Sequence, residues 1–152
     1  MRDPLGGVTG MATQAESQLP LFSPIHVTLA TAIGGPLAGA VVIAMNYRQL
    51  ARTGAGTIAI LLGALATVAL LIAGWLLPKD VSPLLIVAGY TGLLYLVATM
   101  IQGPSLEAHP PAASGTRLAW RAALVGLSSL ALIALIVFIA FLVLPDNWLP
   151  RE

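Results

Sequence analysis

The side chains that most often carry chemistry are scarce in this chain of 152 residues. It contains no cysteine, which excludes a thiol nucleophile, a disulfide framework and a cysteine-based metal site. His26 opens the first long apolar segment, whereas His109 stands in a proline-rich stretch expected at the other side, so the pair does not suit a haem. Ser128 and Ser129 have no histidine or carboxylate within their segment to activate them. We therefore expect no catalytic residue, no metal site and no cofactor, and we do not expect an enzyme.

A second group of polar residues could bind an anion. The first long apolar segment ends in Asn46, Tyr47 and Arg48, and the third becomes more polar toward Gln102. If these ends meet, they form a polar cavity rimmed by arginines, and guanidinium groups suit phosphate. The other interpretation is the ordinary enrichment of arginine and tyrosine at membrane interfaces. The candidate residues are Asn46, Tyr47, Arg48, Tyr95, Thr99, Arg117 and Arg121.

The elements that position these residues follow from composition. Hydrophobic residues make up 58% of the chain and charged residues 9%, against about half and about a quarter in soluble domains. Four charge-free stretches are each about long enough to cross ~30 Å of hydrocarbon at ~1.5 Å per residue. We predict an all-α integral membrane bundle of four transmembrane helices. Its expected parts are a flexible tail (1–24), a domain (25–145) with helices over about 25–45, 57–77, 84–101 and 120–144, and a C-terminal tail (146–152).

The first predicted helix has an unusual run of small residues. Thr31, Gly35 and Gly39 follow one another at helical spacing, on a face that extends to Asn46. Small residues four apart let helix backbones approach closely in lipid, and Pro36 should kink the helix. One interpretation is a seam, made by Thr31, Gly35, Pro36 and Gly39, that contacts a second copy or another protein. The alternative is helix packing inside the bundle itself.

The same region resembles a family. The stretch from Ser23 to Gly39, with its Gly-Gly-Pro-Leu-Ala-Gly core, and the Asn-Tyr-Arg sequence that follows are similar to an uncharacterised family of small bacterial four-helix inner-membrane proteins. The resemblance implies a bacterial inner-membrane protein with this fold, and it implies no particular activity.

The basic residues indicate an orientation. The loops over 46–56 and 102–119 hold three arginines, a fourth follows directly at position 121, and the opposite side holds two basic residues close to helix ends. Because cytoplasmic loops are enriched in lysine and arginine, we expect both loops in the cytoplasm and both termini outside. A net charge of +1 without a basic tract gives no sign of nucleic-acid binding. The basic residues compared are Arg48, Arg52, Arg117 and Arg121 against Lys79 and Arg151.

Two functions remain open. The leading hypothesis is a non-enzymatic accessory, scaffold or partner-binding subunit that packs through small-residue helix faces, either with a second copy or in a larger membrane-protein complex. The alternative is an oligomeric channel or carrier for a small neutral or anionic solute. No charged residue lies in the middle of a predicted span, which argues against a proton- or sodium-coupled carrier.

Overall fold

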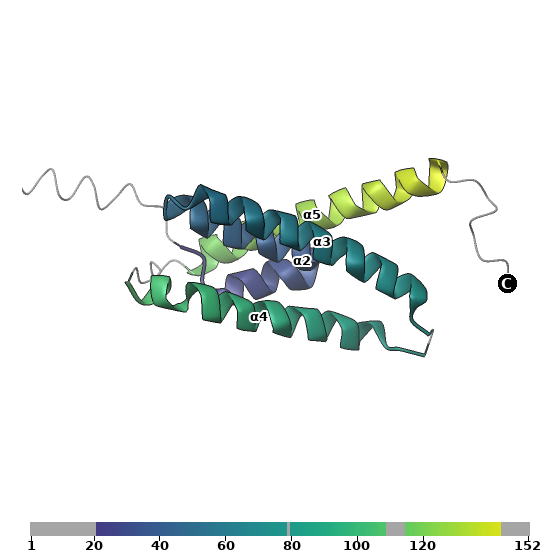
Figure 1. The fold of residues 1–152 in the computed structure, drawn as a ribbon, viewed down its shortest axis with the longest axis horizontal. Coiled ribbons are helices and arrows are strands. Elements are labelled where there is room, and N and C mark those ends of the chain that lie inside the picture. Colours follow the sequence, from purple (N-terminus) through teal and green to yellow (C-terminus); the bar gives the residue numbers. More distant parts are fainter. Residues whose placement is uncertain (1–20, 79, 109–114, 144–152) are drawn as a thin grey trace, which may run out of the picture.

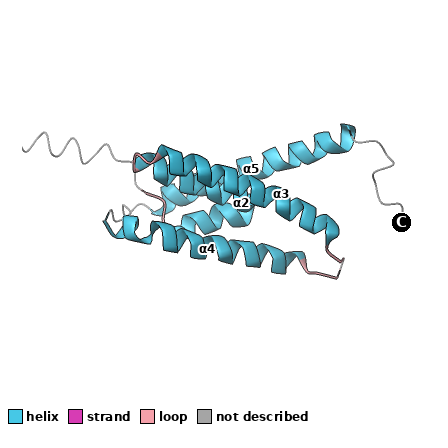
Figure 2. Ribbon diagram, viewed as in Figure 1, coloured by secondary structure: helices cyan, strands magenta, loops and turns pink. Residues whose placement is uncertain are grey.

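The computed structural model describes residues 21–78, 80–108 and 115–143, with the backbone alone for 104–108. It has four helices, α2 (Pro24–Gln49), α3 (Thr53–Leu76), α4 (Pro83–Ala108) and α5 (Gly115–Val143), and no strand occurs in the described residues (Figures 1 and 2). Each helix is long and apolar enough to cross a membrane. The predicted all-α class is therefore confirmed, and the chain is a multi-pass integral membrane protein.

Four helix ends extend beyond the expected bounds by four or more residues, among them the end of α2 at Gln49 and the start of α5 at Gly115. α3 begins at Thr53, so only three residues separate it from α2, and Ala51 makes the turn with a positive φ of 55°. α4 runs through Gly103 and Pro104 to Ala108 instead of ending before them. A proline inside a helix removes one hydrogen bond and bends the backbone, but here it does not end the helix. Much of the loop expected over 102–119 is therefore helical.

α2 is broken at Gly35. This residue has φ 75° and ψ −172°, a combination that is almost restricted to glycine. The next residue, Pro36, disfavours a helical conformation in its predecessor and suits the first turn of a new helix, where its missing N–H is not needed. α2 therefore consists of two arms, over 24–34 and 36–49.

The two arms fold back on each other. In a continuous helix Phe22 and Asn46 would lie about 36 Å apart, yet the Asn46 side chain exchanges two hydrogen bonds of 2.7 Å with the Phe22 backbone. Nearer the break, a Cβ atom added to Gly39 would collide with the Thr31 hydroxyl. α2 is thus a helical hairpin, with its tip at Gly35 and both ends at the same end of the molecule. We call it the α2 hairpin, and we call the end where its arms meet the base.

The α2 hairpin is the centre of the bundle. It contains thirteen buried residues, compared with three in α3 and four in α5. Each of the other helices packs on α2, and within the described residues no two of α3, α4 and α5 have Cα atoms within 8 Å of each other (Figure 1). Thr31, Gly39 and Asn46 are buried, but they do not form one continuous helix face, because the break turns the residues of the two arms toward each other.

Candidate functional site

A buried polar cluster closes the base of the hairpin. Asn46 is only 2% exposed. Its amide nitrogen donates to the Phe22 carbonyl at 2.7 Å and to Gln102 Oε1 at 3.0 Å, while its oxygen accepts from the Phe22 N–H. Buried polar groups need such partners, so Asn46 joins the start of α2, the end of α2 and α4. The Gln102 Nε2 atom is also buried and has no partner among the described residues.

His26 fixes the start of the hairpin. Its Nδ1 lies 2.8 Å from the Ser23 hydroxyl and 3.2 Å from the Ser23 backbone nitrogen, and its Nε2 lies 3.3 Å from the Gly115 carbonyl oxygen. A carbonyl can only accept, so the geometry places the imidazole proton on Nε2 and leaves Nδ1 as the acceptor. The pair forms a capping box, with histidine where glutamate or glutamine is usual.

This role of His26 was not predicted from the sequence. The signal was its position three residues after the N-cap Ser23, where capping-box partners stand. Its contact with Gly115 also places the start of α5 at the base, beside the start of α2.

Thr67 of α3 caps the second arm of the hairpin. Its hydroxyl accepts from the Leu37 N–H at 3.1 Å and donates to the Gly63 carbonyl at 2.8 Å. The first N–H groups of a helix have no partner within it, and a free N–H in hydrocarbon is costly. The Thr67 hydroxyl therefore stabilises the break at the hairpin tip.

The small residues of the hairpin pack inside this chain. A Cβ on Gly34 would meet the Gly126 carbonyl of α5, and one on Gly63 of α3 would meet Ala40. The seam residues Thr31, Pro36 and Gly39 are buried, and their packing is the intramolecular alternative considered above. Gly35 is partly exposed, and a Cβ there would meet no atom within 4 Å.

The residues of the predicted anion site are only partly brought together. Asn46 and Gln102 meet, as the polarity of the two helix ends indicated, but they bond to each other in a buried cluster. Thr99 donates to its own helix at the Leu96 carbonyl, and Tyr95 is 42% exposed. Arg48, Arg117 and Arg121 are exposed. The site as predicted is therefore a set of separate positions, of which Tyr47 alone lines the groove described next.

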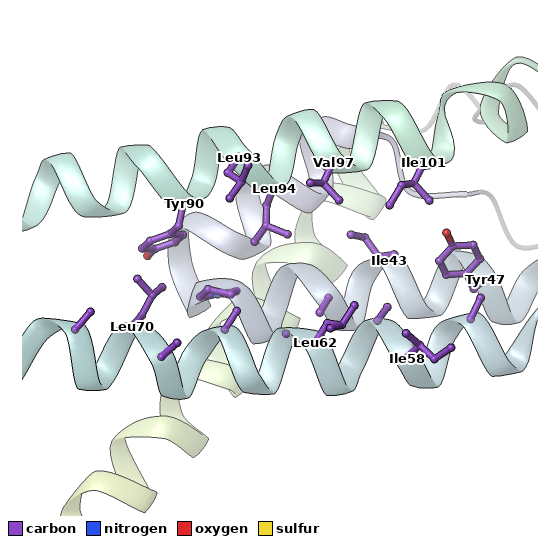
Figure 3. Close-up of a pocket in the computed structure, with 18 residues that line it drawn as sticks. Ile43, Tyr47, Ile58, Leu62, Leu70, Tyr90, Leu93, Leu94, Val97 and Ile101 are labelled. Atoms are coloured by element: carbon purple, nitrogen blue, oxygen red, sulfur yellow. The ribbon is translucent and has the colours of Figure 1, made fainter.

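An apolar groove of about 630 Å³ lies between α3 and α4, with the second arm of the hairpin as its floor (Figure 3). Tyr47 and Tyr90 stand near its two ends, and leucine, isoleucine, valine and alanine side chains line the space between them. The hairpin keeps α3 and α4 apart, and this separation makes the groove.

Comparison with known proteins gave no match, either to a family model, to a curated protein or to a solved structure. The resemblance of the first helix to small bacterial membrane proteins therefore stays a prediction. No group of three or more histidine, aspartate or glutamate side chains suited to a metal ion occurs among the described residues.

Proposed function

We propose that this chain is a non-enzymatic, partner-binding subunit of a membrane assembly. The observation that carries the proposal is the unpacked half of the bundle. Beyond the last buried residues of α3 and α5, Thr67 and Ser129, the helices continue without a buried residue over 68–78, 80–89 and 130–143. We call these three ranges the outer half.

The outer half has an apolar surface that no other described part of this chain covers. Large apolar side chains there are exposed, among them Leu71, Leu84 and Phe138 at 48%, 76% and 61%. In the bundle α5 leans away from α3 and α4 at this end (Figure 1), and helices in lipid are held together by packing. A second copy or another membrane protein inserted between these helices would supply the missing packing.

Cross-linking tests the proposal directly, because the chain has no cysteine of its own. Leu135→Cys places a thiol in the outer half, and Leu124→Cys places a matched one on the same helix within the packed half, both at positions more than half exposed. In native membranes we expect Leu135→Cys to give a cross-linked species of defined mass and Leu124→Cys to give much less. The proposal would be contradicted if both positions were labelled equally, with lipid as the sole cross-linked partner, and if the protein had the mass of a monomer in lipid discs.

We also propose that the N-terminal end of the domain faces the cytoplasm and the C-terminal end faces the opposite side. Because both ends of the α2 hairpin lie at the base, α2 enters the membrane and returns, and only α3, α4 and α5 cross. The base carries Arg48, Arg52, Arg117 and Arg121, which favours the cytoplasmic side. This differs from the sequence-based expectation of both termini outside, because that expectation counted α2 as a crossing.

The location of the N-terminus distinguishes the topology in which α2 is re-entrant from the topology in which all four helices cross the membrane. Both place the α2–α3 turn inside and the end of α5 outside. An N-terminal reporter that is active only in the cytoplasm should be active if α2 is a re-entrant hairpin. An active reporter of extracytoplasmic location at that terminus would restore the four-crossing topology.

A channel or carrier is a second candidate, and one observation favours it. Helices broken near mid-membrane occur at the solute sites of many transporters, and α2 is such a helix. Flux of small neutral or anionic solutes into liposomes, lost in Asn46→Leu, would support this function. Liposomes that stay impermeable while the protein is correctly folded would exclude it.

A further inference from the structure

We propose that the groove between α3 and α4 holds one acyl chain of an anionic phospholipid, whose headgroup is bound at the base by Arg48 and Arg52. The proposal does not depend on partner binding by the outer half. It rests on the length of the groove, on its lining and on the charge at one of its ends.

The groove has a floor and an α4 wall as long as one leaflet, and a longer α3 wall that runs from Ala55 to Ala73. Its floor runs from Pro36 to Tyr47, and its α4 wall runs from Tyr90 to Ile101. Each span covers eleven helical steps, or about 17 Å. Half of the ~30 Å hydrocarbon core is close to this length, so a lipid tail lying in the groove would have its headgroup at the base.

The lining suits a hydrocarbon tail and does not suit a polar solute. Between Tyr47 and Tyr90 every lining side chain is aliphatic, proline or glycine. The volume of about 630 Å³ falls in the range of roughly 300–1,000 Å³ that holds single small ligands. A further helix, ~10–12 Å across with its side chains, would have to force α3 and α4 apart.

The charge at the base selects the headgroup. Arg48 follows the groove residue Tyr47, and Arg52 is the N-cap of α3, three residues before the groove residue Ala55. Both arginines are exposed, and Asp80 lies at the opposite end of α3. Guanidinium groups pair with phosphate in a fixed geometry, and anionic lipids attract basic residues at the cytoplasmic surface.

Native mass spectrometry of the protein in mild detergent tests the proposal. Phosphatidylglycerol and phosphatidylcholine with identical acyl chains would be titrated separately. We expect at least about tenfold tighter binding of phosphatidylglycerol, since each arginine near the headgroup contributes to the attraction. Arg48→Gln combined with Arg52→Gln should remove most of that preference, whereas Arg121→Gln, an exposed arginine of α5, should leave it unchanged.

A second variant tests the groove itself. Ala66 lines the groove and is exposed within it, so Ala66→Phe should fill the space and lower the affinity for both lipids. Ala88→Phe, at an exposed position of α4 outside the lining, is the matched control for folding and for detergent binding.

Three results would overturn the proposal. They are equal binding of the two lipids by the native chain, unchanged lipid binding in Ala66→Phe, and a cross-link from Leu93→Cys in the groove wall to another polypeptide. Failure of the partner proposal would leave both lipid-binding measurements unaffected.

Discussion

The packed half of the bundle and its outer half contain similar apolar residues in similar helices, yet they behave differently. Around the hairpin, Val27, Ala30 and Val42 are fully buried, and backbones approach closely at glycines. In the outer half no described residue is buried, although α5 there is built from leucine, isoleucine, valine and phenylalanine. Hydrophobicity therefore does not decide which half packs.

The difference lies in the reach of the hairpin, whose small residues receive the neighbouring helices. Lipid tails are as apolar as leucine, so helices associate in a membrane where small residues allow close contact. The arms of α2 supply glycine and alanine to three neighbours, but they are only about 16 and 21 Å long. Past the tip the outer half still contains small residues such as Gly74, Gly89 and Ala134, but no arm of α2 lies there to pack against them.

The largest effect is expected at Gly34. A Cβ there would fall on the Gly126 carbonyl and lie 2.8 Å from the Ala38 Cβ. Gly34→Leu should lower the free energy of unfolding by about 3 kcal/mol or more, measured by titration with a denaturing detergent in mixed micelles. Gly89→Leu, where nothing lies within 4 Å, should change it little. Equal losses would mean that the two halves are packed alike.

Removal of the polar cluster at the base should lower the free energy of unfolding slightly less than Gly34→Leu does. Asn46→Leu leaves the N–H and C=O of Phe22 and the Gln102 side chain without a partner. Each unpaired buried group costs about 1–3 kcal/mol, and partial relaxation should limit the loss to about 2–3 kcal/mol in the same titration. Gln49→Leu changes an exposed residue of the same helix and is expected to be nearly neutral. A neutral Asn46→Leu would show that the arms are held together by other contacts.

Substitution of alanine for each of two glycines should change the stability of the protein in opposite directions. Gly35→Ala forces a side chain into a conformation that costs about 1–3 kcal/mol, although its Cβ meets no atom. Gly92→Ala, inside α4 and equally open, should instead stabilise by up to about 1 kcal/mol. The comparison of the two melting temperatures in detergent checks the break itself. If both variants are stabilised, α2 is continuous.

The cap on the second arm should have a smaller effect. Thr67→Val removes the acceptor of the Leu37 N–H and should cost about 1 kcal/mol. Thr57→Val is a close control, because Thr57 donates to a carbonyl four residues earlier, as Thr67 does, but caps nothing among the described residues. A loss in Thr57→Val as large as in Thr67→Val would assign the effect to the intrahelical bond.

The smallest effect is expected in the outer half. Leu135 is 53% exposed, so Leu135→Ala should change the stability of the isolated chain by less than about 0.5 kcal/mol. The same variant should weaken a complex with the proposed partner, measured by co-purification. A large loss of stability in the isolated chain would show that the outer half is packed after all.

Much of the fold could be predicted from the sequence because membrane insertion is a local property. The uncharged stretches, the all-α class and the number of apolar helices follow from composition and length alone. The position of the break could also have been read, since Gly35 directly precedes Pro36 and few other pairs so strongly oppose a continuous helix. The capping role of His26 also depends on the local sequence, but it was not predicted because histidine is not the usual residue at that position of a capping box.

The angle between the two arms of α2 could not be predicted from the sequence. A proline after glycine permits a slight kink or a full reversal, and local preferences hardly distinguish them. Here the reversal is fixed by contacts between distant positions: Asn46 with Phe22 at the base, Gly34 with Gly126 on one side, and Leu37 with Thr67 at the tip. Composition thus determined that this polypeptide belongs in lipid, whereas tertiary packing decided that α2 reverses its direction, because packing alone could choose between two backbone paths of similar local energy.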